Sequence, residues 1–331
     1  LIERCTIRWI GQETHLTNFN GLYTSCGSIS NLVALKCARD KKVNRNRGIQ
    51  SNIILYVSDE THYSIFRAWD ILGCGIDNVR QYQNDNLEDL KLLIQKDLVK
   101  GYVPAAIVCH IGTTNTGKIE ALAQIKNIAH EHGLWLHIDG AYGAAVLLLD
   151  EFQHLRKLAK QADSINIDLH KWFGMPAGTS IIYLNNKHSF IESFQFSADF
   201  IDFQNMNCDL IDQCQMGIEG TRRFYGLRVY AALKLIGFND IKKRIKNSLN
   251  LAKLLENELK VCSKIKVINS VDLSVVNFTI IGYTTFQLQE LAYELYQKNI
   301  AFLTYTTCNE VGCLRCAIVN YETTENDIYN L

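Results

Sequence analysis

The sequence predicts an α/β fold in which a mainly parallel sheet is covered by helices and is followed by a smaller α+β domain. Three observations lead to this prediction: short apolar runs recur along the chain, amphipathic segments separate them, and the pattern changes near Phe224. Apolar runs rich in Ile, Val and Leu are typical of strands buried on both faces. Alternation of such strands with helices indicates a parallel sheet. We therefore expect a large domain over residues 1–223 and a small domain over residues 224–331.

The elements of the large domain follow from these runs. Strands are expected at residues 52–57, 105–110, 134–139, 164–168 and 179–184, and helices at 29–39, 62–72, 87–100, 120–132 and 151–160. In such sheets, ligands bind in the crevice at the carboxyl ends of the strands.

The small domain is expected to begin with a long helical region. The prediction places helices at residues 225–262 and 286–298, and strands at 265–268, 275–281, 301–304 and 314–319. The stretch 185–220 between the two domains is polar, dotted with aromatic residues and weakly periodic, and we expect a loop-rich excursion there.

Composition excludes several classes of protein. The chain has 331 residues, 47% of them hydrophobic, and a formal net charge of zero. Scattered Lys and Arg give no basic surface for nucleic acid or an anionic membrane. No apolar run approaches the roughly 18–20 residues of a membrane span, and no signal peptide opens the chain. Because the chain starts at Leu1 rather than Met, we expect an N-terminal segment to be missing.

The chain holds eleven cysteines, an odd number, which indicates a reduced, cytoplasmic protein. Cys313 and Cys316 form a CxxC pair, with Cys308 upstream. A zinc site needs a fourth ligand. The apolar residues around the pair favour a buried strand with structural cysteines, and we expect no metal.

Lys171 lies just beyond the strand that ends at Asp168, where a crevice is expected, and Trp172 and Phe173 follow it. Partial desolvation lowers the pKa of an amine and favours imine formation near neutral pH. The alternative is a loop lysine that pairs with Asp168.

Asp139 ends the preceding candidate strand, at residues 134–139, and small residues follow it at Gly140, Ala141 and Gly143. A carboxylate at the end of a buried strand is costly unless it is paired. The pyridinium N–H group of a bound aromatic ring would form an ion pair with this carboxylate. The small residues after Asp139 would leave room for such a flat ring. The alternative is an aspartate that caps the following helix.

Three further groups lie just past a strand or at a helix start. The run Thr24-Ser25-Cys26-Gly27-Ser28 leads into a helix, whose free N–H groups and dipole suit a phosphate. Serine-rich helix caps are also common.

His62 follows a strand, and its ring could stack on the ring of a ligand or have a purely structural role. Thr113 and Thr114 offer hydroxyl groups at the same sheet edge. Together with Lys171 and Asp139, these groups predict one site for pyridoxal 5′-phosphate (PLP), which needs an amine, an acid at the ring nitrogen and a phosphate cradle.

Taken in order, these motifs resemble the group II PLP-dependent amino-acid decarboxylases, and most closely the bacterial members grouped with aromatic-L-amino-acid decarboxylases. The resemblance spans about residues 5–330. It is carried by residues 21–32, 58–73, 112–117, 137–143, 168–172, the pair Arg222-Arg223, and 314–320 with Thr323-Thr324. It implies the aspartate-aminotransferase-like fold (PLP fold type I) and a homodimer with its sites at the subunit interface.

The resemblance also implies a role for each matching residue. Lys171 would form the Schiff base and Asp139 would pair with the pyridinium nitrogen. His62 would stack on one face of the ring, with Ala141 against the other. The remaining expected cofactor contacts are Cys26, Gly27, Ser28 and His170 around the phosphate and Thr113 or Thr114 near the cofactor.

The chain departs from the family pattern at several positions. Cys26 replaces a usual Gly, Gly140 a usual Ala and Leu169 a usual Pro. Many members also carry a loop tyrosine that protonates the carbon left after CO2 departs. No tyrosine lies between Tyr183 and Tyr225, and Gln213 is the nearest equivalent by spacing.

The leading functional hypothesis is decarboxylation of an L-amino acid, with aromatic substrates favoured, to an amine and CO2. The missing loop tyrosine keeps open decarboxylation-dependent oxidative deamination to an aldehyde, and carbon–carbon lyase chemistry is a further PLP alternative. A catalytically silent homologue is the alternative of another class. Phe190, Phe194, Phe196, Phe200 and Phe203 could line an aromatic pocket or simply pack.

Overall fold

The computed structural model describes residues 1–49, 52–83, 86–196 and 213–331. Its large domain is built on a seven-stranded sheet with the order β1-β7-β6-β5-β4-β2-β3. Neighbouring strands from β3 to β6 run parallel, whereas β7 is antiparallel to both β6 and β1. The predicted α/β class with a mainly parallel sheet is therefore confirmed. The strands are β1 (Asn20–Thr24), β2 (Ile53–Ser58), β3 (Val79–Tyr82), β4 (Val103–His110), β5 (Trp135–Asp139), β6 (Ser164–Asp168) and β7 (Ser180–Leu184).

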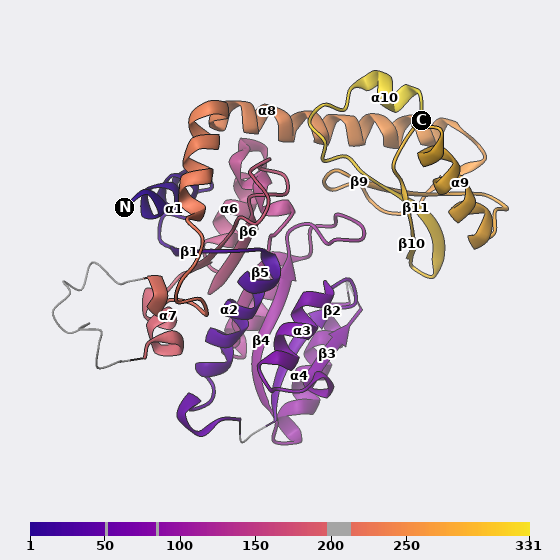
Figure 1. The fold of residues 1–331 in the computed structure, drawn as a ribbon. Helices are drawn as coiled ribbons and strands as arrows, with labels where there is room; N and C mark the ends of the chain where they lie inside the picture. The colour runs from indigo at the N-terminus through magenta and orange to yellow at the C-terminus, as the bar shows by residue number, and fades with distance from the viewer. Residues whose placement is uncertain (50–51, 84–85, 197–212) are drawn as a thin grey trace.

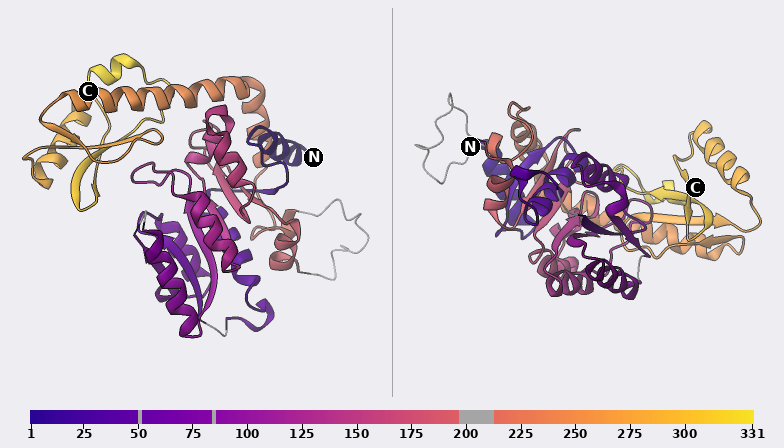
Figure 2. Two further views of the ribbon diagram at one scale, coloured as in Figure 1. Left: turned by 180° about the vertical axis from the view of Figure 1, so that it is seen from behind. Right: turned by 90° about the horizontal axis from the view of Figure 1, so that it is seen from below.

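Helices cover both faces of this sheet (Figures 1 and 2). Side chains of β2 show the consequence, because Ile54 and Tyr56 join one hydrophobic cluster while Leu55 and Val57 join the other. Burial of both faces explains why the strands are continuously apolar rather than alternating. The helices are α1 (Ile2–Glu13), α2 (Gly27–Asp40), α3 (Tyr63–Ile71), α4 (Leu87–Val99), α5 (Leu122–Glu131), α6 (Gln153–Ala159) and α7 (Lys187–Phe194).

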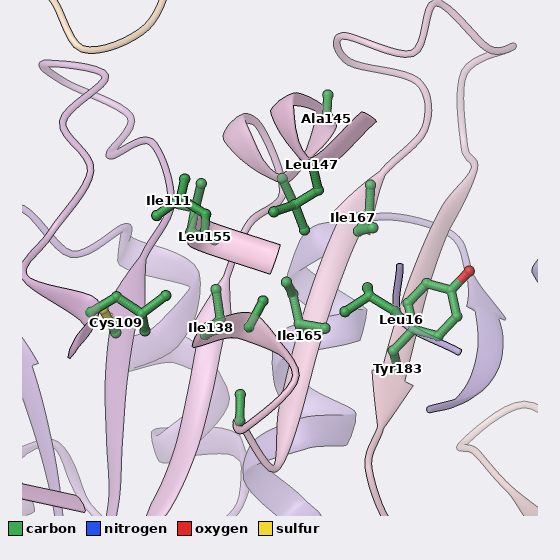
Figure 3. Packing of buried hydrophobic residues seen from close by; sticks show 14 of the residues in the cluster. Leu16, Cys109, Ile111, Ile138, Ala145, Leu147, Leu155, Ile165, Ile167 and Tyr183 are labelled. Atoms are coloured by element: carbon green, nitrogen blue, oxygen red, sulfur yellow. The ribbon is translucent and has the colours of Figure 1, made fainter. Parts of the chain in front are cut away.

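The larger cluster packs against the middle of the sheet. Figure 3 shows Ile138 of β5 beside Ile165 of β6, with Ile167 further along β6 and Leu155 of α6 and Leu147 on the same side. These isoleucines are essentially inaccessible to solvent. The dense packing fixes the ends of β5 and β6 relative to one another, and the polar residues that end these strands are fixed with them.

A small domain follows helix α8 (Tyr225–Val261), which runs from the large domain to a four-stranded antiparallel sheet (Figure 1). Gly237 interrupts the helical backbone with φ 75°, a left-handed conformation that glycine adopts readily. The remaining elements are β8 (Ile265–Val267), β9 (Val275–Ile280), α9 (Thr285–Gln297), β10 (Thr304–Cys308), β11 (Val311–Ala317) and α10 (Glu325–Tyr329). The strand predicted around Cys313 and Cys316 is confirmed as β11.

Helix α8 contributes to two hydrophobic cores. Ile241 and Ile245 pack in the core of the large domain, whereas Leu251 and Leu255 pack against the small sheet. The hydrophobic core against which α8 packs therefore changes between Ile245 and Leu251. The domain division at residues 223 and 224 stays a prediction.

Two predictions in this part of the chain need correction. The strand predicted at residues 301–304 is wrong, because β10 begins only at Thr304; of the three residues before it, only Leu303 is buried. The predicted loop region contains helix α7, in which Phe190 and Phe194 are buried in the core and so do not form an aromatic pocket. Phe196 is exposed, and Phe200 and Phe203 lie outside the described residues.

In the part of the chain that the structure describes, no helix combines the length and the hydrophobicity that crossing a membrane requires.

Asp97 of α4 joins that helix to the edge of the sheet. Its carboxylate accepts a hydrogen bond from the hydroxyl group of Tyr56 at 3.0 Å and from Nη2 of Arg80 at 3.1 Å. The Asp97 side chain is buried, so loss of its charge would leave two donors without an ionised acceptor.

We predict that Asp97→Asn lowers the free energy of unfolding by about 3 kcal/mol, as expected when one partner of a buried ion pair is removed. Glu88→Gln on the same helix is the matched control, because the Glu88–Lys91 ion pair is exposed and contributes at most about 1 kcal/mol. Urea unfolding of both variants measures the difference. Equal losses of stability would contradict this account.

Candidate functional site

Polar residues end three adjacent strands of the large sheet. His110 ends β4, Asp139 ends β5 and Asp168 ends β6, and His110 lies directly opposite Asp139 in the register of the parallel pair. A cavity of about 170 Å³ opens at this edge. Its walls are formed by Cys26, Gly27, Ser28, Asn31, His62, Ser64, His110, Gly112, Thr114, Asp139, Ala141, Tyr142, Asp168 and Lys171.

Two residues expected near the cofactor lie outside these walls. The hydroxyl of Thr113 donates to Oε2 of Glu60 at 2.6 Å. His170 has its Nδ1 2.8 Å from the carbonyl oxygen of Thr179, which can only accept, so Nδ1–H is the donor. The other candidate residues from the sequence all line the cavity.

Asp139 is one of two buried acids that line the cavity. Its Oδ2 accepts a hydrogen bond from Nδ2 of Asn31 at 2.9 Å, and its Oδ1 accepts one from the backbone N–H of Ala141 at 3.1 Å. Burial alone would raise the pKa of Asp139, but His110, His137, Lys171 and the Asn31 hydrogen bond outweigh it and hold the pKa below its ordinary value. The carboxylate is therefore ionised although it is buried.

The amide of Asn31 is fixed by its neighbours. Its Oδ1 lies 2.7 Å from Nδ2 of Asn166 and 2.9 Å from Nε2 of His137, and both of these donate to it. Burial lowers the pKa of His137 to about 4, so that ring is neutral. Because Oδ1 is fully used as an acceptor, the Nδ2 group must point at Asp139.

The same amide group orients His62. Nδ2 of Asn31 also donates to Oγ of Ser64 at 3.0 Å, and Oγ lies 2.7 Å from Nδ1 of His62. Ser64 therefore gives its own proton to Nδ1, which also accepts the Ser64 backbone N–H at 3.3 Å. Burial lowers the pKa of His62. The ring is neutral and carries its proton on Nε2.

Lys171 is the only lysine among the residues that line this cavity, and its Nζ lies 3.6 Å from Oδ2 of Asp168. Nε2 of His170 lies 3.7 Å from the same oxygen. Burial raises the pKa of Asp168 despite these neighbours. This contact is the pairing of Lys171 with Asp168 that the sequence analysis named as the alternative to a reactive amine. The same contact holds the amine at the cavity wall.

Helix α2 begins at the cavity. Cys26 caps it with an extended backbone and no side-chain hydrogen bond, so the first N–H groups have no intrahelical acceptor. Gly27 is needed here, because a Cβ atom at that position would lie 2.9 Å from Oδ2 of Asp168 and 3.2 Å from Cβ of Ala141.

The glycine at position 140, where the family pattern has alanine, has a local structural explanation. A Cβ atom on Gly140 would lie 2.5 Å from Cβ of Ala144 and 3.0 Å from the carbonyl oxygen of Asn166. The methyl group of Ala144 thus occupies space that an alanine at position 140 would need. The substitution is compensated within the chain and leaves Asp139 in place.

A larger cleft of about 1090 Å³ adjoins the cavity and shares His62 and Thr114 with it. One wall comes from the large domain and the other from the β10–β11 hairpin of the small domain. Nε of Arg315 on β11 donates to the carbonyl oxygen of Thr114 at 3.1 Å, which joins the hairpin to the cavity wall. Gln213 lines neither of these two spaces.

Sequence reasoning missed several lining residues, among them Asn31, Ser64, His110 and Tyr142. Asn31 and Ser64 lie inside helices, where neither spacing nor composition marks them. His110 could have been found, because it ends a predicted strand as Asp139 does.

The cavity fits the cofactor that the motifs imply. It holds one amine, one ionised buried carboxylate, a helix N-terminus with unused N–H groups and a neutral imidazole. Oδ1 of Asp168 is buried with no hydrogen-bond partner among the described residues, as expected where a polar group is still to bind.

Comparisons with known proteins agree with this geometry. Residues 1–281 match the pyridoxal-dependent decarboxylase conserved domain. Aromatic-L-amino-acid decarboxylase from Bacillus atrophaeus is 28% identical over 344 residues, covering 100% of this chain and 71% of that protein. 4-Hydroxyphenylacetaldehyde synthase from Rhodiola rosea is 27% identical, with coverage of 100% and 71%.

Among solved structures, Oryza sativa TDC with PLP and tryptamine has a TM-score of 0.90 at 21% identity, covering 99% of this chain and 73% of that one. Mouse CSAD has a TM-score of 0.88 at 24% identity, with coverage of 99% and 73%. These two likenesses support the fold. The match over residues 1–281 shows more: this chain belongs to the pyridoxal-dependent decarboxylase family, whose enzymes depend on pyridoxal phosphate.

Proposed function

We propose that this chain catalyses the α-decarboxylation of an L-amino acid, with an aromatic amino acid favoured, to an amine and CO2. The observation that carries the proposal is a single cavity in which Lys171 and the ionised, buried Asp139 lie together beside the start of α2. The aromatic preference rests on the names of relatives, among them the Bacillus atrophaeus decarboxylase.

In this proposal each lining residue has a role toward the cofactor. Lys171 attaches it covalently through Nζ, and Asp139 pairs with the ring nitrogen. His62 and Ala141 flank the ring. The N–H groups of the cap residue Cys26 and of Gly27 and Ser28 at the start of α2 bind the phosphate, with His170 close behind Asp168 and Thr114 beside the ring.

Bound PLP supplies an electron sink that stabilises the carbanion formed when CO2 leaves. The chain's own groups do the rest. Asp139 holds a proton at the ring nitrogen, because its pKa is depressed and it remains an anion in the pH range of the reaction. The bonds from Asn31 and Ala141 fix its two oxygens, so the carboxylate needs no reorganisation. Lys171 is the amine placed to return a proton to the substrate carbon.

Two products are open to this site. A specific observation favours the second, because the Rhodiola rosea relative is named an aldehyde synthase and matches the chain as extensively as the decarboxylase does. The sequence also lacks a tyrosine between Tyr183 and Tyr225. The second candidate is therefore decarboxylation-dependent oxidative deamination to an aldehyde. Carbon–carbon lyase chemistry and a silent homologue have no such support.

We also propose a homodimer with its sites near the subunit interface, and the two-domain division at residues 223 and 224. A reducing compartment is consistent with the nine described cysteines other than Cys214, which form no disulfide bond.

An assay of products tests the proposed reaction. The protein loaded with PLP is incubated with L-tyrosine, L-tryptophan and L-phenylalanine, and CO2, amine, aldehyde and peroxide are measured. We expect CO2 and amine in equal amounts from at least one substrate. Aldehyde with peroxide and no amine would replace the decarboxylase proposal by the second candidate.

Asp139→Asn tests the role of the buried carboxylate. The amide keeps the shape but cannot hold a proton at the ring nitrogen as an anion does, so we predict a roughly thousandfold loss of rate, about 4 kcal/mol of barrier. The visible absorbance of bound PLP should persist in this variant and disappear in Lys171→Ala. A rate within about threefold of the unaltered protein would refute the role of Asp139.

A further inference from the structure

His110 is a buried histidine in the cavity wall to which no role has yet been given. Its Nδ1 lies 3.0 Å from Oε2 of Glu120, and the same carboxylate oxygen accepts the backbone N–H of His110 at 2.7 Å. The two side chains are 3% and 1% exposed. A histidine and a glutamate are therefore locked together inside the protein, beside the proposed cofactor.

The surroundings of this pair favour its charged form. Burial is the largest single influence and lowers the pKa of His110, but the charge and hydrogen bond of Glu120, together with Asp139 and Glu60, raise the pKa overall. Burial likewise raises the pKa of Glu120, but His110 and a hydrogen bond with Ser58 together lower it overall. The histidines that face this cation, His62 and His137, have pKa values lowered by burial and add no competing charge near neutral pH.

The imidazolium has one donor that nothing in the described residues uses. With Nδ1–H directed at Glu120, the second proton is on Nε2, and Nε2 is buried without a hydrogen-bond partner. A buried donor left unsatisfied costs about 1–3 kcal/mol. His110 is itself part of the cavity wall, so an acceptor in a bound ligand can relieve that cost.

The strand order indicates which edge of the cofactor ring faces His110. His110 on β4 and Lys171 after β6 lie on opposite sides of Asp139, and Gly27 at the start of α2 lies close to Asp168 of β6. On the pyridine ring of PLP, the phosphate arm and the phenolic oxygen are on opposite sides of the axis through the ring nitrogen. With the nitrogen at Asp139 and the phosphate at α2, the ring edge that carries the 2-methyl group and the phenolic oxygen faces β4, and of these two only the oxygen can accept a hydrogen bond.

We propose that His110, held as an imidazolium by Glu120, donates a hydrogen bond from Nε2 to the phenolic oxygen of the cofactor. This inference rests on the proposed function, because it assumes PLP attached at Lys171. The cation stabilises the negative phenolate and disfavours a second positive charge on the nearby nitrogen of the Lys171 linkage. His110 is thus a ligand-binding residue, and Glu120 is a positioning residue that keeps it charged.

The charge of His110 can be measured without any cofactor. Nitrogen-15 NMR of histidine-labelled protein, with the His110 signals identified by their loss in His110→Gln, follows both ring nitrogens against pH. We expect His110 to remain doubly protonated above the ordinary histidine pKa of about 6.5, and to lose that proton at lower pH in Glu120→Gln. Titration of His110 at or below about 6.5 in the unaltered protein would overturn the inference, whether or not Glu120→Gln folds.

The contact with the cofactor is tested by the pH dependence of its absorbance. In His110→Gln, which keeps a neutral donor, we expect the absorbance midpoint of the Lys171-linked cofactor to rise by about one pH unit. The absorbance midpoint should rise by a similar amount in Glu120→Gln. His130→Gln, on the exposed face of α5, serves as the matched control. A cofactor band with an unmoved midpoint in both variants would overturn the inference and leave the proposed function standing. Absence of the band from the unaltered protein would overturn both.

Discussion

An ionised carboxylate buried at the end of β5 is the constraint on which the rest of the site depends. An isolated carboxylate at such depth would take up a proton, because desolvation penalises the charged form. Asp139 avoids this through two hydrogen bonds and nearby positive charge. The parallel sheet makes the arrangement possible, because it brings the ends of β4, β5 and β6 to one edge with their polar side chains together.

The side-chain amide of Asn31 orients two residues of the cavity, the acid Asp139 and the proposed ring-stacking residue His62. Asn31 donates to Asp139 and to Ser64, and Ser64 in turn fixes the tautomer of His62. His137 and Asn166 behind it leave the amide no alternative orientation. A polar network that is fully satisfied in this way is rigid. The cavity is therefore preorganised before any ligand arrives.

The sequence predicted the parts of this site that local patterns encode. The strand at residues 164–168 was placed correctly, and Asp139 and Lys171 followed from strands that end in polar residues. Asn31 could not be inferred, because its importance comes from a contact with a residue 108 positions away. The strand predicted at residues 301–304 failed because its apolar residues precede β10, whose own residues are mostly polar and only partly buried. Local hydrophobicity misleads at such half-exposed edges.

Lys171 is the proposed attachment point of the cofactor, and peptide mapping after chemical reduction locates that attachment. Borohydride converts the linkage between a lysine and PLP into a stable bond, and tandem mass spectrometry of the digest then identifies the modified residue. We expect the phosphopyridoxyl group on the peptide that contains Lys171 and on no other lysine in equal yield. Modification of other lysines without Lys171 would contradict this expectation.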